Sequence, residues 1–208
     1  KKNNIQLSSF NDQVIYDPGF LKTGQGKPFS VFTPFKRRWI ENFDMNFLEL
    51  EIPRKLKKLS LIQSDLSVLK FTKTHSVNID LWPAGESAAH EKLANFLQSK
   101  AQLYSESRNS PIIDGTSRIS PYLALGILSP KRCILEALKL NNFEFTSGNK
   151  GICKWIDEIV WREFYRNIMH SFPRVSQNHP FQDYTNAIQW RHSSIELKAF
   201  YAGKTGFP

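Results

Sequence analysis

The sequence has little cysteine and no long apolar segment, and both absences limit the classes of protein it can belong to. Its 2 cysteines, Cys133 and Cys153, form no C-x-x-C pair, so neither a zinc-binding pattern nor a secreted disulfide framework is indicated. No stretch approaches the roughly 18 consecutive apolar residues of a membrane helix, and the polar start leads into no signal peptide. We therefore expect a cytoplasmic protein without a membrane segment. Because residue 1 is Lys, we expect either a piece of a longer chain or a start that was processed or omitted.

Signatures of several enzyme classes are also missing. Gly203-Lys204-Thr205 resembles the end of a phosphate loop, but Lys198 stands where that loop needs glycine. Gly24-Gln25-Gly26 is followed by Phe29 where a dinucleotide fingerprint needs its third glycine. The 5 histidines are dispersed without i, i+4 pairs, and no hydrolase signature is present. Phosphate-loop, dinucleotide-binding, hydrolase and metal-site interpretations are therefore excluded.

Basic and aromatic side chains are abundant. Lys and Arg number 28 against 19 Asp and Glu, which gives a net charge of +9. This charge favours nucleic acid as a partner, although a basic surface without a specific partner has the same composition. Hydrophobic residues make up 40% and aromatic residues 13% of the chain, which is too much for a disordered protein.

The first 80 residues predict one strand, one short helix and a long connection. Residues 14–16 form a β-type run that the turn Asp17-Pro18-Gly19 closes. Thr33-Pro34 is typical of an N-cap followed by a first-turn proline, at the start of a short amphipathic helix. Residues 52–80 carry basic residues and scattered Leu or Ile without a sustained period, which predicts a connection between two domains.

From about residue 85 the pattern becomes helical. Apolar residues recur at three- and four-residue spacings between residues 89 and 97, as on a helix packed on one side. Ser129-Pro130 predicts the start of a second helix, and residues 152–171 predict a third that ends before Pro173.

Two segments carry candidate chemistry. Residues 114–120 (DGTSRIS) combine a glycine turn, hydroxyls and an arginine at a possible helix start, a set suited to an anionic phosphate. An ordinary capped helix after a turn gives the same local sequence. In residues 155–166 (WIDEIVWREFYR), a carboxylate, a guanidinium and rings lie three or four positions apart and share one side of a helix, which suits a nucleobase or a ring cofactor. A solvated ion pair above a Trp-rich core is the alternative.

Four motifs follow one another with a particular order and spacing. They are residues 116–123 (TSRISPYL), 128–130 (LSP), 161–166 (WREFYR) and 203–208 (GKTGFP). Together they resemble the DNA photolyase and cryptochrome family, and most of all the bacterial photolyases of cyclobutane pyrimidine dimers. The resemblance runs from about Val14, through VFTPFK at residues 31–36, to Pro208, so it covers nearly all of this chain but only the middle of a family member.

The resemblance implies a fold and its partners. The fold is an α+β fragment with the tail of an N-terminal α/β antenna domain at residues 1–32, a connector at 33–84 and the first part of an all-α FAD-binding domain at 85–208. The implied cofactor is FAD, and an antenna chromophore of the folate or deazaflavin type is left open. DNA containing pyrimidine dimers is the implied partner, no metal is implied, and we expect a monomer.

Motif positions also imply roles for individual residues. The hydroxyls and backbone of residues 116–120 resemble contacts to the FAD phosphates, and Arg108 resembles a contact to a DNA phosphate. The helix from Glu158 to Tyr165 resembles the floor on which a flipped dimer lies. The implied cofactor-binding set is Tyr104, Thr116, Ser117, Arg118, Ile119, Ser120, Trp155 and Arg162, and the implied DNA-binding set is Arg108, Glu158, Trp161, Arg162 and Tyr165.

The implied reaction is driven by light. Excited reduced flavin donates an electron to the dimer, the cyclobutane ring splits and the electron returns. Glu158 and Trp161 are the implied catalytic residues: Trp161 stacks on the extruded lesion, and protonated Glu158 hydrogen-bonds its carbonyl edge. The enzyme implied for the complete protein is a deoxyribodipyrimidine photo-lyase. A cryptochrome-type flavin photoreceptor and an inactive truncated remnant are the alternatives, and a (6-4) lesion is the alternative substrate.

The sequence departs from the family pattern at three places. Phe200, with Tyr201 beside it, stands where related photolyases carry the surface tryptophan of their electron-transfer chain, which predicts altered photoreduction of oxidised flavin. Ser176-Gln177 stands where relatives place a cysteine and a lysine near the folate antenna. The family's remaining flavin-pocket residues fall beyond Pro208, so we expect this segment alone to bind FAD weakly or not at all and to be inactive.

Overall fold

The computed structural model describes residues 7, 11–48 and 79–207. It divides the chain into two units, Lys1–Ser171 and Phe172–Pro208, which are described separately below. Most of the predicted connection at residues 52–80 falls on residues 49–78 and so lies outside the described residues. The predicted domain boundaries at residues 32 and 84 stay a prediction.

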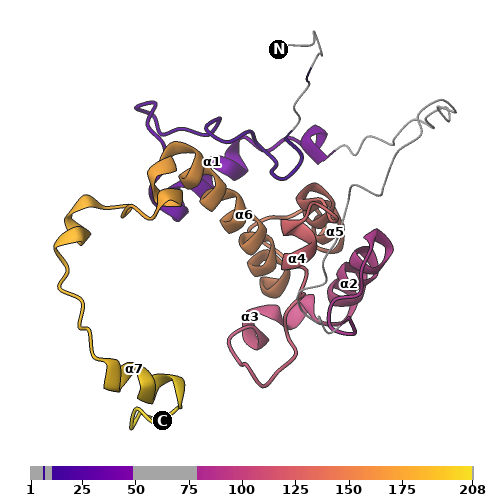
Figure 1. Cartoon of the computed structure of the whole chain (residues 1–208). Helices are drawn as coiled ribbons and strands as arrows, with labels where there is room; N and C mark the ends of the chain where they lie inside the picture. Colours follow the sequence, from indigo (N-terminus) through magenta and orange to yellow (C-terminus); the bar gives the residue numbers. More distant parts are fainter. Residues whose placement is uncertain (1–6, 8–10, 49–78, 208) are drawn as a thin grey trace, which may run out of the picture. The chain divides into compact units, whose positions relative to one another are not determined.

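The first unit is built from helices around one long helix, α6 (Lys150–Ser171). Its apolar residues lie on more than one side of the helix because α1, α3 and α5 all pack against it (Figure 1). Each fully buried aliphatic or aromatic side chain contributes roughly 1.5–3 kcal/mol of burial free energy, so α6 is the centre of the core. The other elements of this unit are α1 (Phe32–Glu41), η1 (Met45–Leu48), α2 (Glu86–Ser99), η3 (Ala101–Leu103), α3 (Tyr104–Ser107), α4 (Ser120–Ala124) and α5 (Pro130–Leu140).

The three helices predicted after residue 85 are confirmed. In α2 the predicted apolar stripe is buried, from Ala89 to Leu97. In α5 the hydroxyl of Ser129 accepts a hydrogen bond from the N–H of Lys131 at 3.2 Å, with Pro130 in the first turn. This is the capping chemistry that the sequence predicted. Helix α6 begins two residues before the predicted Ile152 and ends at Ser171 as predicted.

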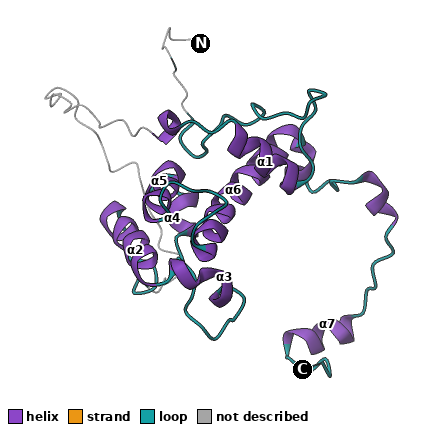
Figure 2. Ribbon diagram, turned by 180° about the vertical axis from the view of Figure 1, so that it is seen from behind, coloured by secondary structure: helices purple, strands orange, loops and turns teal. Residues whose placement is uncertain are grey.

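The predicted strand at residues 14–16 is wrong. No strand occurs in the described ranges, where helices and loops alone are drawn (Figure 2), so the described part of the expected α+β fragment consists of helices and loops. Val14, Ile15 and Tyr16 are buried, as a strand in a core would be. The ring of Tyr16 packs on Trp39 and Phe47, and the N–H groups of Ile15 and Tyr16 donate to a side chain of α6 instead of to a neighbouring strand.

The predicted cap of the first helix is also wrong in detail. Helix α1 begins at Phe32, with Val31 as an N-cap that makes no side-chain hydrogen bond. Thr33 and Pro34 lie inside its first turn, where the missing N–H of proline costs nothing. The first-turn proline is therefore where it was predicted, and only the cap residue differs.

The second unit contains η4 (Pro173–Gln177), η5 (Asp183–Ala187) and α7 (Ser194–Tyr201). None of its described residues is buried, and large rings such as Trp190 and Tyr201 are more than 70% exposed. Local contacts hold it: Arg174 pairs with Asp183, and Ser193 caps α7 by accepting the N–H of Glu196 at 3.3 Å. The described residues of this unit therefore form no apolar core of their own.

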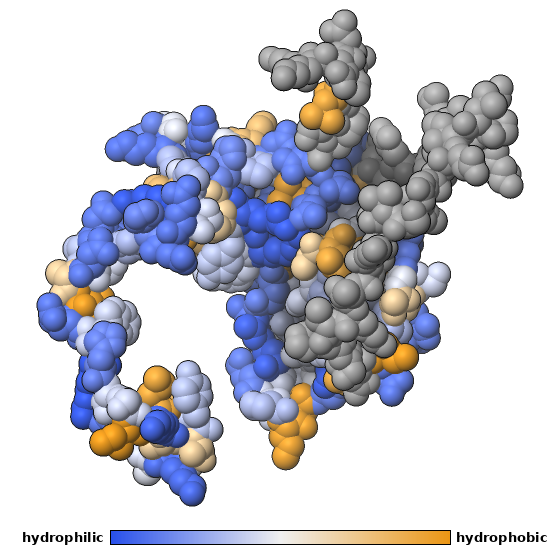
Figure 3. All heavy atoms as spheres, in the orientation of Figure 1, coloured by the Kyte–Doolittle hydropathy of each residue, from blue (hydrophilic) through white to orange (hydrophobic). Residues whose placement is uncertain are grey.

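No helix in the described ranges has the length and the apolar character that a membrane crossing requires. On the face drawn in Figure 3, hydrophilic side chains dominate the described surface, and apolar ones form scattered spots. This distribution agrees with the high net charge of +9.

Candidate functional site

A pocket of about 1050 Å³ opens beside α6 in the first unit. Every residue that the sequence predicted for flavin or lesion binding lines it, with the exception of Arg108. The structure therefore brings together two predicted sets that are up to 61 positions apart in sequence, from Tyr104 to Tyr165. The predicted residues that line it are Tyr104, Thr116, Ser117, Arg118, Ile119, Ser120, Trp155, Glu158, Trp161, Arg162 and Tyr165.

Helix α6 forms one wall of the pocket because its lining residues repeat every three or four positions. Residues 155, 158, 159, 162, 165, 166 and 169 all face the opening. The start of α6 is held very close to the segment that leads into α3, since a Cβ added to Gly151 would lie 2.3 Å from the backbone oxygen of Gln102. Only glycine permits this approach, which holds the start of α6 against η3.

The opposite wall is the loop that carries residues 116–120. Asp114 holds this loop through two ion pairs, with the Nζ of Lys100 at 2.7 Å and with the Nη2 of Arg118 at 2.9 Å. The bond from Lys100 is the main reason that the pKa of Asp114 is lowered. Thr116 and Ser120 are exposed at the pocket wall, and Arg118 has a φ of +51°, in the left-handed region. The loop therefore presents hydroxyls and one arginine from a backbone that other residues hold in place.

Glu158 does not pair with Arg162, although both line the pocket. Its carboxylate pairs with the guanidinium of Arg108, which reaches it from the end of α3 and also lies 5.4 Å from the centre of the Tyr104 ring. Arg108 therefore contacts two residues that line the pocket: Tyr104, which was predicted to bind flavin, and Glu158, which was predicted to bind the lesion. The bond from Glu158 is the main reason that the pKa of Arg108 is raised.

Arg162 instead ties three segments together. Its guanidinium donates to the backbone oxygen of Gln13 and, at 3.1 Å, to that of Leu123. Burial lowers the pKa of Arg162, because the charged form loses water there. The alternative interpretation, a solvated Glu158–Arg162 ion pair, is therefore wrong, since each partner is engaged elsewhere.

Two tryptophans of α6 contribute to the pocket in different ways. Trp155 is 2% exposed and packs on Phe96, with ring centres 5.2 Å apart, so it is mainly a core residue whose edge reaches the pocket. Trp161 is only half-buried and lies among rings: it stacks on Phe32 at 3.6 Å and is 5.5 Å from Tyr165. Of the two, Trp161 is the one whose ring can receive a planar ligand.

Sequence analysis missed a buried acid on the other side of the same helix. Glu163 is 2% exposed, and its carboxylate accepts hydrogen bonds from the N–H of Ile15 at 2.7 Å, the N–H of Tyr16 at 3.1 Å and the indole Nε1 of Trp39 at 2.9 Å. Burial raises its pKa to about 7, although these three bonds act in the opposite direction. A signal was present, because Glu163 lies between apolar residues that also occupy the buried side of the helix.

A second polar residue on α6 completes this attachment. The side-chain oxygen of Asn167 accepts the N–H of Gly19 at 2.9 Å, one helical turn beyond Glu163. The segment from residue 13 to residue 19 is thus fixed to α6 by hydrogen bonds to Arg162, Glu163 and Asn167. It forms a layer of the first unit, and Pro18 reaches the rim of the pocket.

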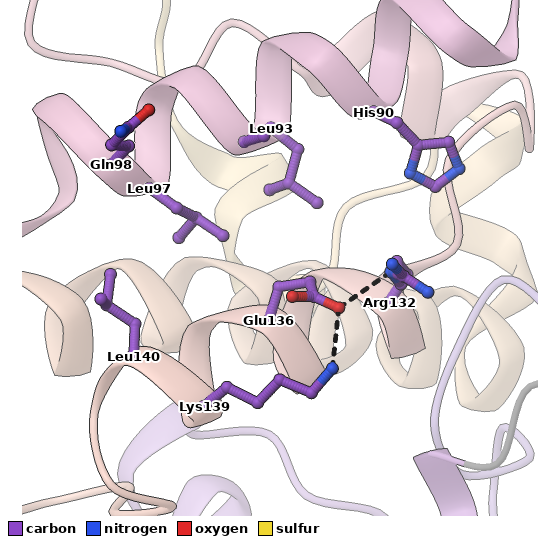
Figure 4. A pocket seen from close by; sticks show the side chains of 9 residues that line it. His90, Leu93, Leu97, Gln98, Arg132, Glu136, Lys139 and Leu140 are labelled. Atoms are coloured by element: carbon purple, nitrogen blue, oxygen red, sulfur yellow. Dashed lines mark hydrogen bonds and ion pairs between the residues drawn. The ribbon is translucent and has the colours of Figure 1, made fainter.

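A further groove of about 730 Å³ lies between α2 and α5 (Figure 4). None of the predicted site residues lines it. Its floor is formed by leucines, and its charged groups interact with one another, since Glu136 forms ion pairs with Arg132 at 3.0 Å and with Lys139 at 3.2 Å. The pocket beside α6 is therefore the better candidate for a functional site. In the described ranges, no group of three His, Cys, Asp or Glu side chains could hold a metal ion.

Two known family models match parts of this chain. The model of the FAD binding domain of DNA photolyase matches residues 155–208, and the DNA photolyase model matches residues 1–56. The first match contains the α6 wall of the pocket, and the second contains the segment that Glu163 holds. The two matches thus indicate a chain of the photolyase type, with part of the family's FAD-binding domain at residues 155–208.

Individual proteins support the same assignment. The deoxyribodipyrimidine photo-lyase of Escherichia coli is 34% identical over 205 residues, which are 99% of this chain and 43% of that protein. The enzyme of the same name from Neurospora crassa is 32% identical over 95% of the chain and 35% of its own length. The crystal structure of a class III photolyase from Agrobacterium tumefaciens superposes with a TM-score of 0.71 at 30% identity, over 93% of this chain and 40% of that one.

The chain belongs to the DNA photolyase and cryptochrome family. A cryptochrome from Synechocystis shares the fold, with a TM-score of 0.63 at 20% identity over 94% of this chain and 42% of that one. The chain spans less than half the length of the relatives it matches.

Proposed function

We propose that this chain is part of a photolyase that uses light and reduced FAD to split cyclobutane pyrimidine dimers in DNA. The observation that carries the proposal is the pocket beside α6, which joins the residues implied for flavin contact and those implied for lesion contact in one space. A light-driven electron transfer needs such a common space, because donor and acceptor must lie close together. The family assignment and the names of the relatives support the same reaction.

The pocket has the chemistry that FAD requires. Hydroxyls of Thr116, Ser117 and Ser120 and the guanidinium of Arg118 line one wall and suit a diphosphate. Tyr104 and the edge of Trp155 provide apolar ring surface for the planar part of the cofactor. When bound, reduced FAD supplies the light-excited electron that opens the cyclobutane ring.

On the lesion side, we assign Trp161 as the platform for an extruded pyrimidine dimer. A damaged pair unstacks at lower cost than an intact one, and base stacking on an aromatic ring then compensates for part of that cost. The basic side chains Arg162 and Arg166 also line the pocket and suit the DNA backbone. Selectivity thus arises from the ease of extrusion and from the fit on Trp161.

Glu158 needs a proton for its proposed role. A pyrimidine carbonyl only accepts hydrogen bonds, so Glu158 can hydrogen-bond it only as a neutral carboxylic acid. In the structure its carboxylate pairs with the guanidinium of Arg108. We therefore propose that a DNA phosphate attracts Arg108 when DNA binds, so that Glu158 is free to hydrogen-bond the lesion in its protonated form.

The test uses the protein expressed from its complete reading frame. Its visible spectrum is recorded, and it is then illuminated under reducing conditions with an oligonucleotide that contains a cyclobutane dimer, beside a dark control and a (6-4) substrate. Light-dependent reversal of the cyclobutane dimer supports the proposal. Bound flavin without reversal would indicate a cryptochrome-type photoreceptor, reversal of the (6-4) lesion alone would change the substrate, and a colourless inactive protein would indicate a remnant.

A further inference from the structure

Helix α1 covers one face of the indole that lines the pocket. The rings of Phe32 and Trp161 lie 3.6 Å apart at an angle of 9°, which is a nearly parallel stack. Trp161 lines the pocket, whereas Phe32 is not among its lining residues. Phe32 therefore contacts Trp161 from behind, and a ligand in the pocket meets the ring from another side.

Phe32 can hold this ring because α1 is itself fixed along α6. Phe35, one turn later, is 1% exposed and packs on Phe164 with ring centres 5.3 Å apart. Lys36 pairs with Asp157 at 2.5 Å, one turn before Trp161 on α6. Contacts on both sides of Trp161 thus prevent α1 from sliding, and Phe32 keeps its place behind the indole.

Tyr165 differs from Phe32 in this respect. It lies 5.5 Å from Trp161 at an angle of 27°, lines the pocket and is 58% exposed. An exposed side chain on the same helix can change rotamer without disturbing the core. It therefore belongs to the ligand side of Trp161, whereas Phe32 belongs to the protein side.

We propose that Phe32 is a positioning residue, which covers one face of Trp161 and fixes the plane of the indole so that a planar ligand stacks on the opposite face. This inference rests on the proposed function, in which that ligand is an extruded pyrimidine dimer. The physical reason is that stacking requires parallel planes, and an indole that rotates about its two side-chain torsions must first be ordered. The stack with Phe32 orders the indole of Trp161 already in the free protein, before any ligand binds.

The arrangement also joins the two parts of the chain that match different family models. Phe32 lies within residues 1–56, which match the DNA photolyase model, and Trp161 lies within residues 155–208, which match the FAD binding domain. The stacking platform is thus built from both parts.

The experiment measures affinity for a duplex with one cyclobutane dimer and for the undamaged duplex, using the protein from its complete reading frame. Phe32→Leu keeps apolar volume without a flat ring, and Phe32→Tyr keeps the ring. We expect Phe32→Leu to weaken dimer binding about three- to tenfold, a part of the stacking free energy, and to leave undamaged DNA unaffected. Phe32→Tyr is expected to bind as the native protein does.

Two further variants separate positioning from general stability. Phe43→Ala removes a ring that stacks on Trp39 of α1 at 5.2 Å and also contacts Phe145. No ring contact joins Phe43 to Trp161, so this variant is the control for a loss of aromatic packing near α1. It should lower stability without lowering discrimination. In a Trp161→Ala background, Phe32→Leu should have no further effect on dimer affinity, because the two act through one interaction.

Each other result has a definite meaning. Native-like discrimination in Phe32→Leu, an equal loss in Phe43→Ala, or an undiminished effect of Phe32→Leu without Trp161 would overturn the inference and leave the proposed function intact. A native protein that does not distinguish damaged from undamaged DNA would overturn both.

Discussion

Replacing Glu163 by Gln should remove a dependence of stability on pH that the native chain has between about pH 4.5 and 7. Burial raises the pKa of this carboxyl from its ordinary 4.5 to about 7 in the folded state. Between these values the folded chain holds a proton that the unfolded chain releases, so stability falls as the pH rises. The stabilisation by protonated Glu163 is fully present below about pH 4.5 and is lost as the pH rises to about 7. Above that pH, stability no longer depends on the protonation of this group.

The size of the effect follows from that difference. One pH unit corresponds to about 1.4 kcal/mol, so the native free energy of unfolding should fall by about 3 kcal/mol across this range on account of Glu163 alone. At 2% exposure the carboxyl is not screened by solvent, which is why nearly the whole effect should be seen. The amide of Gln has almost the same shape and does not titrate.

The assay is urea denaturation followed by circular dichroism at pH values from about 4 to 8. The free energy of unfolding is plotted against pH for the native protein and for Glu163→Gln. Other groups contribute equally to both curves, so their difference gives the pH dependence that is due to Glu163. Glu41→Gln is the matched control, because Glu41 is an exposed acid on α1 that pairs with Arg38 at 3.4 Å. Its curve should run parallel to the native one. A Glu163→Gln curve that also runs parallel would refute the reasoning.

Three further outcomes are expected. Trp161→Ala should weaken binding of dimer-containing DNA by about 1–3 kcal/mol in a filter or fluorescence titration, and unchanged discrimination would contradict its role as the platform. Glu158→Ala should lower the yield of repair per absorbed photon more than it lowers affinity, whereas equal losses would make Glu158 merely structural. Gly151→Ala should lower stability by about 1–3 kcal/mol in urea, because its Cβ meets backbone oxygens at 2.3 and 2.4 Å. Gly24→Ala, with nothing within 4 Å of its Cβ, should not.

Local patterns in the sequence were sufficient for the helices and for one wall of the site. Helix α5 could be predicted because its cap and its proline are adjacent in sequence, and Glu158, Trp161 and Tyr165 because three- and four-residue spacings place them on one side of a helix. On the opposite wall, residues 114–120 were singled out by their local sequence, and Tyr104 and the flavin role came from the family resemblance. Members of this wall, such as Tyr104 and Thr116, have no periodic relation to α6.

Contacts between distant segments could not be predicted in this way. The pairing of Arg108 with Glu158 joins residues 50 positions apart, and Glu163 accepts a hydrogen bond from Ile15, which is 148 positions away in the sequence. Such partners depend on tertiary packing, which local propensity does not encode. The predicted strand at 14–16 failed for the same reason, because the N–H groups of Ile15 and Tyr16 donate to the side chain of Glu163, 148 and 147 positions away, and not to a neighbouring strand.

The bonds to Glu163 also constrain the order in which the protein can form. They join residues 148, 147 and 124 positions apart. Synthesis proceeds from the N-terminus, so Ile15, Tyr16 and Trp39 leave the ribosome while their common acceptor has not yet been made. Closing so long a loop is also slow. While the residues between this apolar segment and Glu163 are being translated, the segment is a nascent chain without α6 to pack on, the form in which chaperones bind polypeptides.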